Sequence, residues 1–71
     1  MVNNMVMLDK TEIRALRLRL GLSADKFGAL FEPRVTGNTV FRWEQGVRFP
    51  SRRHQIRLNQ IVEEQKQLQS A

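Results

Sequence analysis

The chain has 71 residues and a net charge of +5, with 12 basic side chains, 7 acidic ones and no cysteine. This length suffices for one domain with a limited core, which without disulfides depends on regular helix packing or self-association. The single histidine, His54, cannot form a zinc site alone, and no apolar run approaches the roughly 18 residues of a membrane span. We therefore expect no cofactor, no metal and no membrane partner, and the lack of cysteine fits a cytoplasmic location.

The N-terminal residues 1–8 are apolar but short, and we expect a loosely ordered arm there. A first helix is predicted over Lys10–Leu20, because Asp9 suits the N-cap and Glu12 completes a capping box. Its apolar stripe consists of Ile13, Leu16 and Leu20. Gly21 ends this helix, since glycine adopts left-handed backbone angles at little cost.

A second helix is predicted to begin at Ser23, whose hydroxyl suits the N-cap, and Asp25 favours the positive end of the helix dipole. Its buried face, at the spacing i, i+3 and i+4, consists of Phe27, Leu30 and Phe31. Pro33 limits the helix, because a proline moves the residue before it, Glu32, away from helical angles.

A third helix is predicted from about Thr36 to Gln45, with Thr36 or Asn38 as the cap; Thr36 fits the pattern better. The apolar stripe is formed by Val40 and Trp43, with Phe41 less clear. The polar side away from this stripe carries Asn38, Thr39 and Arg42. Gly46 ends the helix.

After a basic loop from Val47 to Pro50, Ser51 suits the cap of a last helix over residues 51–69. Its apolar positions are Ile56, Ile61, Val62 and Leu68, with Leu58 less clear. The stripe is thin, so it indicates either a frayed, exposed end or a seam for a partner subunit. No segment alternates with period two, and we predict an all-α fold: a compact bundle of four to five helices in one domain, residues 9–71.

The positive charge is concentrated in residues 34–57, which contain six arginines and a single glutamate. The arginines are Arg34, Arg42, Arg48, Arg52, Arg53 and Arg57. A planar guanidinium can donate two parallel hydrogen bonds to a phosphate or to guanine. This concentration favours a nucleic acid as partner, while a solvated basic face, a membrane surface and an acidic protein stay open as alternatives.

Three short motifs resemble, in their order and spacing, the phage-repressor-like (Cro/XRE-type) helix-turn-helix family. They are Gly21-Leu22-Ser23, the run Thr39-Val40-Phe41-Arg42-Trp43-Glu44-Gln45-Gly46, and Pro50-Ser51, and the resemblance covers about residues 12–62. It implies a lambda-repressor-like fold with a central helix-turn-helix, whose second helix enters the major groove of double-stranded DNA.

The chain departs from the family pattern at two places. The turn is about two residues longer at Glu32-Pro33-Arg34, so either the angle between the two helices differs or the second helix ends in a longer loop. Ala24 stands where the family often has a glutamine that holds a phosphate. The longer turn concerns the register of the contacts with DNA, and Ala24 implies that one phosphate contact is missing.

The resemblance also assigns roles to individual residues. The base-reading positions map to Gly37, Asn38, Thr39 and Arg42. Phosphate contacts are expected from Ser23, Lys26, Arg34, Thr36, Arg48, Arg52 and Arg53. Arg17 is expected to pair with Glu44 as a largely buried structural ion pair. Trp43 and Ile56 are interpreted as core residues together with the apolar positions of the first three helices, and His54 is expected at the surface.

These features predict a sequence-specific DNA-binding transcriptional regulator, in particular a repressor of an inverted-repeat operator. Small proteins of this family resemble phage or mobile-element regulators, including autoregulators of operons, so we expect a bacterial cell or a phage-infected host. The alternative is an antitoxin-like or adaptor module whose main partner is another polypeptide, docked on the last helix. No enzyme is expected, because the sequence has no cysteine, no paired carboxylates at useful spacing and no Gly-rich phosphate loop.

A homodimer is expected, because one recognition helix reads only a few base pairs and useful specificity calls for two half-sites. The first candidates for the dimer surface are Ile61, Val62 and Leu68 in the last helix. The second candidate is the N-terminal arm, with Val2, Met5 and Val6.

Overall fold

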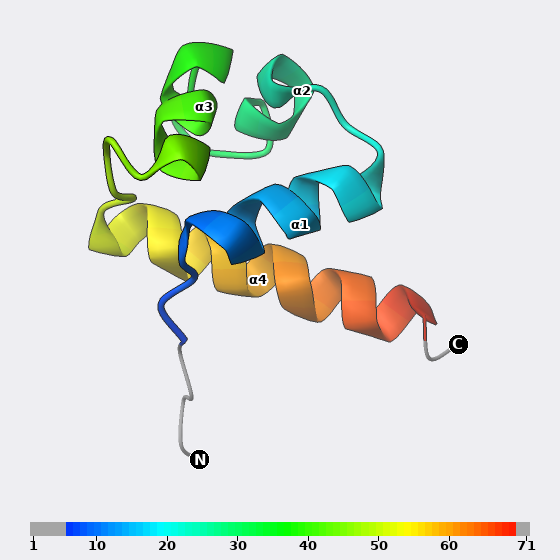
Figure 1. The fold of residues 1–71 in the computed structure, drawn as a ribbon. Helices are drawn as coiled ribbons and strands as arrows, with labels where there is room; N and C mark the ends of the chain where they lie inside the picture. The colour runs from blue at the N-terminus through cyan, green and yellow to red at the C-terminus, as the bar shows by residue number, and fades with distance from the viewer. Residues whose placement is uncertain (1–5, 70–71) are drawn as a thin grey trace.

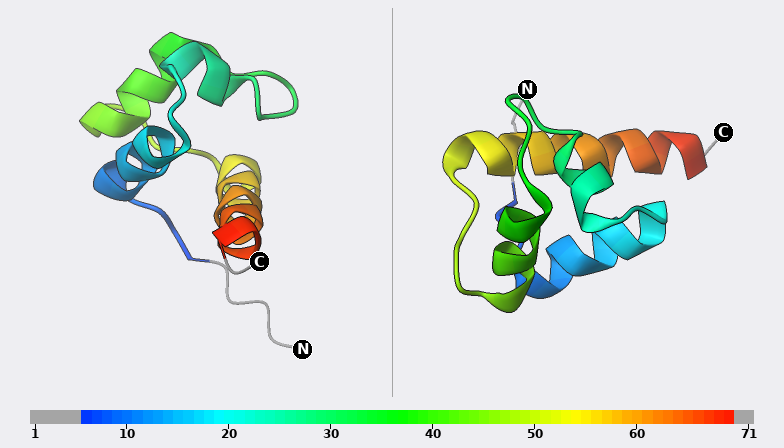
Figure 2. Two further views of the ribbon diagram at one scale, coloured as in Figure 1. Left: turned by 90° about the vertical axis from the view of Figure 1, so that its right-hand side faces the viewer. Right: turned by 90° about the horizontal axis from the view of Figure 1, so that it is seen from above.

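The computed structural model describes residues 6–69, with side chains for residues 6–67. Four helices follow one another in this part of the chain: α1 (Lys10–Leu20), α2 (Ala24–Gly28), α3 (Gly37–Gln45) and α4 (Arg52–Gln69). α1 and α4 lie beside each other, and α2 and α3 lie above them (Figures 1 and 2). No strand occurs within residues 6–69, so the predicted all-α class is confirmed for this part of the chain.

Short polar side chains define where the first three helices begin. The Asp9 carboxylate accepts the Glu12 N–H at 2.8 Å, and the Glu12 carboxylate accepts the Asp9 N–H at 2.9 Å. Ser23 caps α2 and Thr36 caps α3, each accepting an N–H three residues ahead. These bonds satisfy backbone donors that have no partner inside a helix.

Two glycines end the longer helices of this group. Gly21 follows α1 with a φ of 70°, and Gly46 follows α3 with a φ of 77°. Both angles lie in the left-handed region, where a side chain is strained. The observed bounds of α1, Lys10–Leu20, therefore match the prediction, and α3 begins directly after the expected cap, Thr36.

α2 is shorter than predicted and ends at Gly28, so Phe31 reaches the core from a loop rather than from a helix. A Cβ atom added to Gly28 would lie 1.9 Å from the carbonyl oxygen of Val35, and the Val35 N–H donates to the Gly28 carbonyl at 3.0 Å. Residues 29–34 thus form a wide loop that returns to the end of α2 (Figure 2, left).

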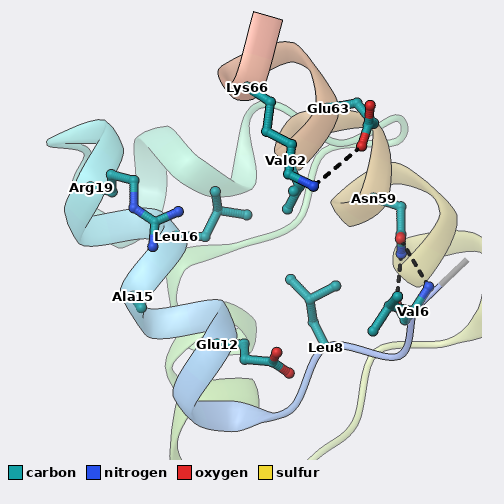
Figure 3. Close-up of a pocket in the computed structure, with 10 residues that line it drawn as sticks. All are labelled: Val6, Leu8, Glu12, Ala15, Leu16, Arg19, Asn59, Val62, Glu63 and Lys66. Atoms are coloured by element: carbon teal, nitrogen blue, oxygen red, sulfur yellow. Dashed lines mark hydrogen bonds and ion pairs between the residues drawn. The ribbon is translucent and has the colours of Figure 1, made fainter. Parts of the chain in front are cut away.

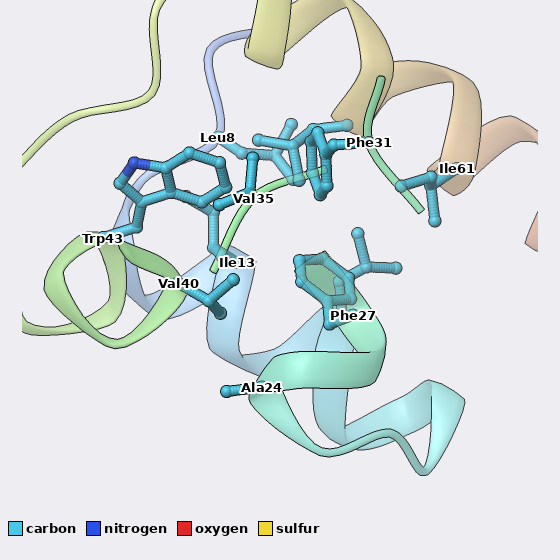
Figure 4. Close-up of a cluster of buried hydrophobic side chains, with 11 residues drawn as sticks. Leu8, Ile13, Ala24, Phe27, Phe31, Val35, Val40, Trp43 and Ile61 are labelled. Atoms are coloured by element: carbon cyan, nitrogen blue, oxygen red, sulfur yellow. The ribbon is translucent and has the colours of Figure 1, made fainter. Parts of the chain in front are cut away.

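The core lies where the four helices meet, and an aromatic group occupies its centre (Figure 4). Its buried apolar side chains are Leu8, Ile13, Leu16, Ala24, Phe27, Phe31, Val35, Val40, Trp43, Leu58 and Ile61, with Leu20, Leu22, Leu30 and Val62 partly buried around them. The ring of Phe31 makes edge-on contacts with Phe27 and Trp43, at centroid distances of 5.7 and 5.4 Å. His54 lies 5.1 Å from Trp43, so it is half-buried rather than at the surface as expected.

α4 faces the core with a different side from the predicted one. Leu58 is fully buried, whereas Ile56, expected in the core, is 42% exposed. The physical reason is Gln55, which occupies a core-facing position although it is polar. Its side-chain amide accepts the Leu8 N–H at 2.9 Å and donates to the Leu8 carbonyl at 3.1 Å, so its burial leaves both polar atoms satisfied.

Residues 6–8 are bound to α4 by two side-chain amides of this kind. One turn beyond Gln55, the Asn59 Oδ1 accepts the Val6 N–H at 3.0 Å, and Asn59 Nδ2 donates to the Val6 carbonyl at 2.8 Å. Leu8 packs into the core between these two bonds. The domain therefore includes three residues that were expected in a loosely ordered arm; the rest of that arm, 1–5, lies outside the described residues.

One residue of the predicted dimer seam on α4 is buried in the core. Ile61 is 3% exposed and cannot contact a second subunit without unpacking the core. Val62 is half-buried, and the side chain of Leu68 lies outside the described residues, as do Val2 and Met5 of the arm.

Candidate nucleic-acid interface

α3 has one buried and one open side. Val40 and Trp43 pack into the core, while Asn38, Arg42 and Gln45 are exposed. The three exposed residues follow the spacing i, i+4 and i+7, which places them in one stripe along the helix. Two predicted base-reading residues thus share this open stripe with Gln45, which the sequence analysis missed although the same spacing identifies it.

The other two predicted base-reading residues have structural roles. Gly37 is buried against α2: its N–H donates to Asp25 Oδ1 at 3.0 Å, and an added Cβ would lie 2.3 Å from the same oxygen. Its small size therefore permits a close approach to α2, which corrects the expectation that Gly37 approaches a base. Thr39 is half-buried, and its hydroxyl lies 3.0 Å from the hydroxyl of Thr36, the cap of α3.

A buried ion pair holds α3 against α1. Arg17 Nε donates to Glu44 Oε2 at 2.6 Å and Nη2 donates to Oε1 at 3.0 Å, with the two side chains 12% and 6% exposed. Arg17 also donates to the Leu22 carbonyl at 3.1 Å, and its guanidinium carbon lies 5.7 Å from the ring centroid of Phe41. Arg17 and Glu44 thus form the structural pair that the resemblance implies.

The contacts of this pair favour the charged form of Arg17. The hydrogen bonds from Arg17 to Glu44 raise the pKa of Arg17; burial opposes this shift, and the negative charge of Glu44 adds to it. Because the pair fixes the inner side of α3, the open stripe with Arg42 is presented in one orientation.

A shallow hollow lies between the N-terminal ends of α2 and α3. Its lining consists of Ser23, Ala24, Asp25, Thr36, Gly37, Asn38 and Phe41. It brings two predicted phosphate contacts, Ser23 and Thr36, next to one predicted base contact, Asn38. Lys26, three residues after Ser23 on α2, is exposed. Ala24 is 5% exposed and belongs to the core.

Exposed arginines lie before and after α3. Arg34 is in the preceding loop, Arg48 is in the following loop, and Arg52 and Arg53 are in the first turn of α4. Residues 45–62 contain no acidic side chain. Positive charges at the N-terminal end of a helix are unfavourable, because they oppose the helix dipole. Arg52 and Arg53 therefore do not stabilise α4, and their presence there needs another explanation.

Arg57 differs from the other arginines of this region because it has partners within the fold. Its Nε donates to the Leu30 carbonyl at 2.7 Å, and its Nη1 lies 3.3 Å from Gln60 Oε1 and 3.5 Å from a carboxylate oxygen of Glu64. Arg57 therefore ties the loop between α2 and α3 to α4. Its guanidinium is largely occupied by these contacts.

A second hollow, of about 320 Å³, lies between α1 and α4 (Figure 3). It is lined by Val6, Leu8, Glu12, Ala15, Leu16, Arg19, Asn59, Val62, Glu63 and Lys66. Its lining includes both acidic and basic side chains, and Lys66 lies 3.7 Å from Glu63. None of the predicted DNA-contacting residues lines it, and its mixed charge contrasts with the uniformly positive loop after α3.

Comparisons with protein family models, with curated proteins and with solved structures find no match to this chain. Within the described residues, no group of three or more His, Cys, Asp or Glu side chains is placed to hold a metal ion. None of the helices in residues 6–69 is both long and apolar enough to cross a membrane. The function is therefore inferred from the geometry of α3 and the charges around it.

Proposed function

We propose that this protein binds double-stranded DNA sequence-specifically as a helix-turn-helix repressor and places α3 in the major groove. The observation that carries the proposal is the open stripe of Asn38, Arg42 and Gln45 on a helix whose opposite side is fixed in the core. Arginine pairs with guanine, and asparagine or glutamine with adenine, each through two hydrogen bonds to the base edge. The major groove, about 12 Å wide, admits one α-helix.

The contacts around α3 support this orientation. α2 is attached to the start of α3 by the bond from the Gly37 N–H to Asp25, so both helices present their N-terminal ends together. Three exposed cations flank the stripe along the chain: Lys26 and Arg34 come before it, and Arg48 comes after it. In a major-groove complex these cations neutralise the phosphates that border the groove and set the position of α3.

A homodimer belongs to this proposal, because three side chains specify too few base pairs for a unique operator. The expected operator is an inverted repeat whose half-sites are about one helical turn apart. Because Ile61 lies in the core, the dimer surface involves residues other than Ile61.

The direct test is selection of bound duplexes from a random-sequence pool, followed by titrations at several salt concentrations. We expect enrichment of a two-fold symmetric motif. Arg42→Ala should weaken binding to this motif by about 1–3 kcal/mol and relax the preference at one position of each half-site. Arg48→Ala should weaken binding to all sequences alike and lower the salt slope by about 1.

Lys66→Ala is the matched control, because it also removes one positive charge but from the hollow between α1 and α4. It should leave the motif and the affinity unchanged. If no motif is enriched and the three variants bind DNA equally weakly, the proposal is wrong, and a polypeptide partner becomes the better hypothesis.

A further inference from the structure

The loop between α3 and α4 holds two large apolar side chains in solvent. Val47 is 66% exposed and Phe49 is 81% exposed, the highest value among the large hydrophobic side chains of the described residues. Pro50, the next residue, is buried and holds the loop to the domain. A phenylalanine ring in this position gains free energy from any partner that removes it from water.

The surroundings of Phe49 indicate the chemistry of that partner. Arg48 precedes it, and Arg52 and Arg53 follow in the first turn of α4, all exposed and with no acidic side chain in residues 45–62. A second copy docked symmetrically on this loop would bring the same arginines together, and their charges would repel. A polyanion that also offers flat apolar surfaces matches both features, and DNA is such a polyanion.

The loop keeps Phe49 next to the end of α3. Three residues separate it from Gln45, the last residue of α3. The N–H groups of Val47 and Arg48 both donate to the Arg42 carbonyl, at 3.0 and 3.2 Å, so the loop turns back against the end of the helix. With α3 in the major groove, which is about 12 Å wide, Phe49 would therefore lie at the border of this groove, beside the phosphate strand that separates it from the neighbouring minor groove.

We propose that Phe49 is a second DNA-contacting residue, whose ring inserts from the minor groove at a flexible base step next to the bases read by α3. Arg48, Arg52 and Arg53 bind the phosphates around the insertion. Apolar side chains that insert in this way unstack a step partly and bend the duplex by 20–90°. This inference rests on the proposed DNA-binding function and adds recognition of DNA deformability, which favours TA and CA/TG steps over stiffer ones.

The test uses the full chain and two duplexes that share the selected motif. One has a TA step in the flank that Phe49 would reach, and the other has a G·C-rich flank. Affinity is measured for both, and bending is followed by energy transfer between dyes at the DNA ends. The variants are Phe49→Ala and Phe49→Leu, with Val47→Ala as the control from the same loop.

The wild type should bind the TA duplex at least fivefold more tightly than the G·C-rich duplex and should bend it. Phe49→Ala should lose both the preference and the bend, and Phe49→Leu should keep part of each, because leucine also inserts. Val47→Ala should behave as the wild type. The salt slope should be unchanged in all three variants, since none removes a charge.

The inference is overturned if Phe49→Ala retains the flank preference and the bend. It is also overturned if Phe49→Ala converts a dimer into a monomer in sedimentation, which would make a second copy the partner of the ring. Arg42→Ala separates this inference from the proposed function, because it should relax the preference at one position of each half-site and keep the dependence on the flank. A melting temperature equal to that of the wild type would show that each Phe49 variant is folded.

Discussion

Removal of Arg17 alone should destabilise the domain strongly, because Glu44 would be left buried without its partner. The Glu44 side chain is 6% exposed, and Arg17 supplies both of the hydrogen bonds described for its carboxylate. Breaking one side of such a pair costs about 3–5 kcal/mol. A domain of this length has a free energy of unfolding of about 4–11 kcal/mol in total, so Arg17→Met should lose a large part of it.

Replacement of both partners by apolar residues should cost far less than replacement of one. Arg17→Met combined with Glu44→Leu removes both charges and keeps most of the buried volume, an exchange that is often close to neutral. The hydrogen bond from Arg17 to the Leu22 carbonyl is also lost, which leaves a cost of about 1 kcal/mol.

Urea unfolding of the wild type, the two single variants and the double variant, followed by far-UV circular dichroism at pH 7, measures these free energies. The difference between the double variant and the sum of the singles gives the coupling of the pair. A loss below about 1 kcal/mol in Arg17→Met, or a double variant as unstable as the sum of the singles, would show that the buried pair does not have this role.

Three further predictions concern stability and can be checked by the same unfolding assay. Burial, and secondly the charge of Arg53, lower the pKa of His54 below its ordinary value of 6.5, so stability should be full above that pH and fall as pH decreases below it. His54→Phe should flatten this dependence. Gly28→Ala should cost about 3 kcal/mol or more, because its Cβ would lie 1.9 Å from a loop carbonyl oxygen. Leu58→Ala should cost about 2–5 kcal/mol, and Ile56→Ala less than about 1 kcal/mol, since only Leu58 is fully buried. Equal losses at the last two positions would contradict the observed orientation of α4.

The parts of the fold that could be predicted are those set by residues near one another in sequence. Asp9 with Glu12 caps α1 within one turn, and Gly21 and Gly46 end helices through their own backbone angles. The open side of α3 also follows from helical spacing, with Arg42 placed as predicted. The same spacing could have identified Gln45, which stands three residues beyond Arg42.

The parts that could not be predicted depend on contacts between distant segments. α2 ends at Gly28 because Val35 returns to it, and no signal at Gly28 itself indicates this approach. α4 has its observed orientation because the polar side chain of Gln55 is satisfied by the backbone of Leu8, 47 residues away. The apolar pattern alone predicts that the polar Gln55 is at the surface and that Ile56 is in the core.

The most direct test of the central claim is the map of backbone amide shifts in the NMR spectrum when the selected duplex is added to the labelled protein. The largest changes should fall in α3, in the loop with Arg48 and Phe49, and at the N-terminal ends of α2 and α4. Changes confined to the hollow between α1 and α4, around Arg19 and Lys66, would contradict the claim, because α3 would then lie away from the bound DNA.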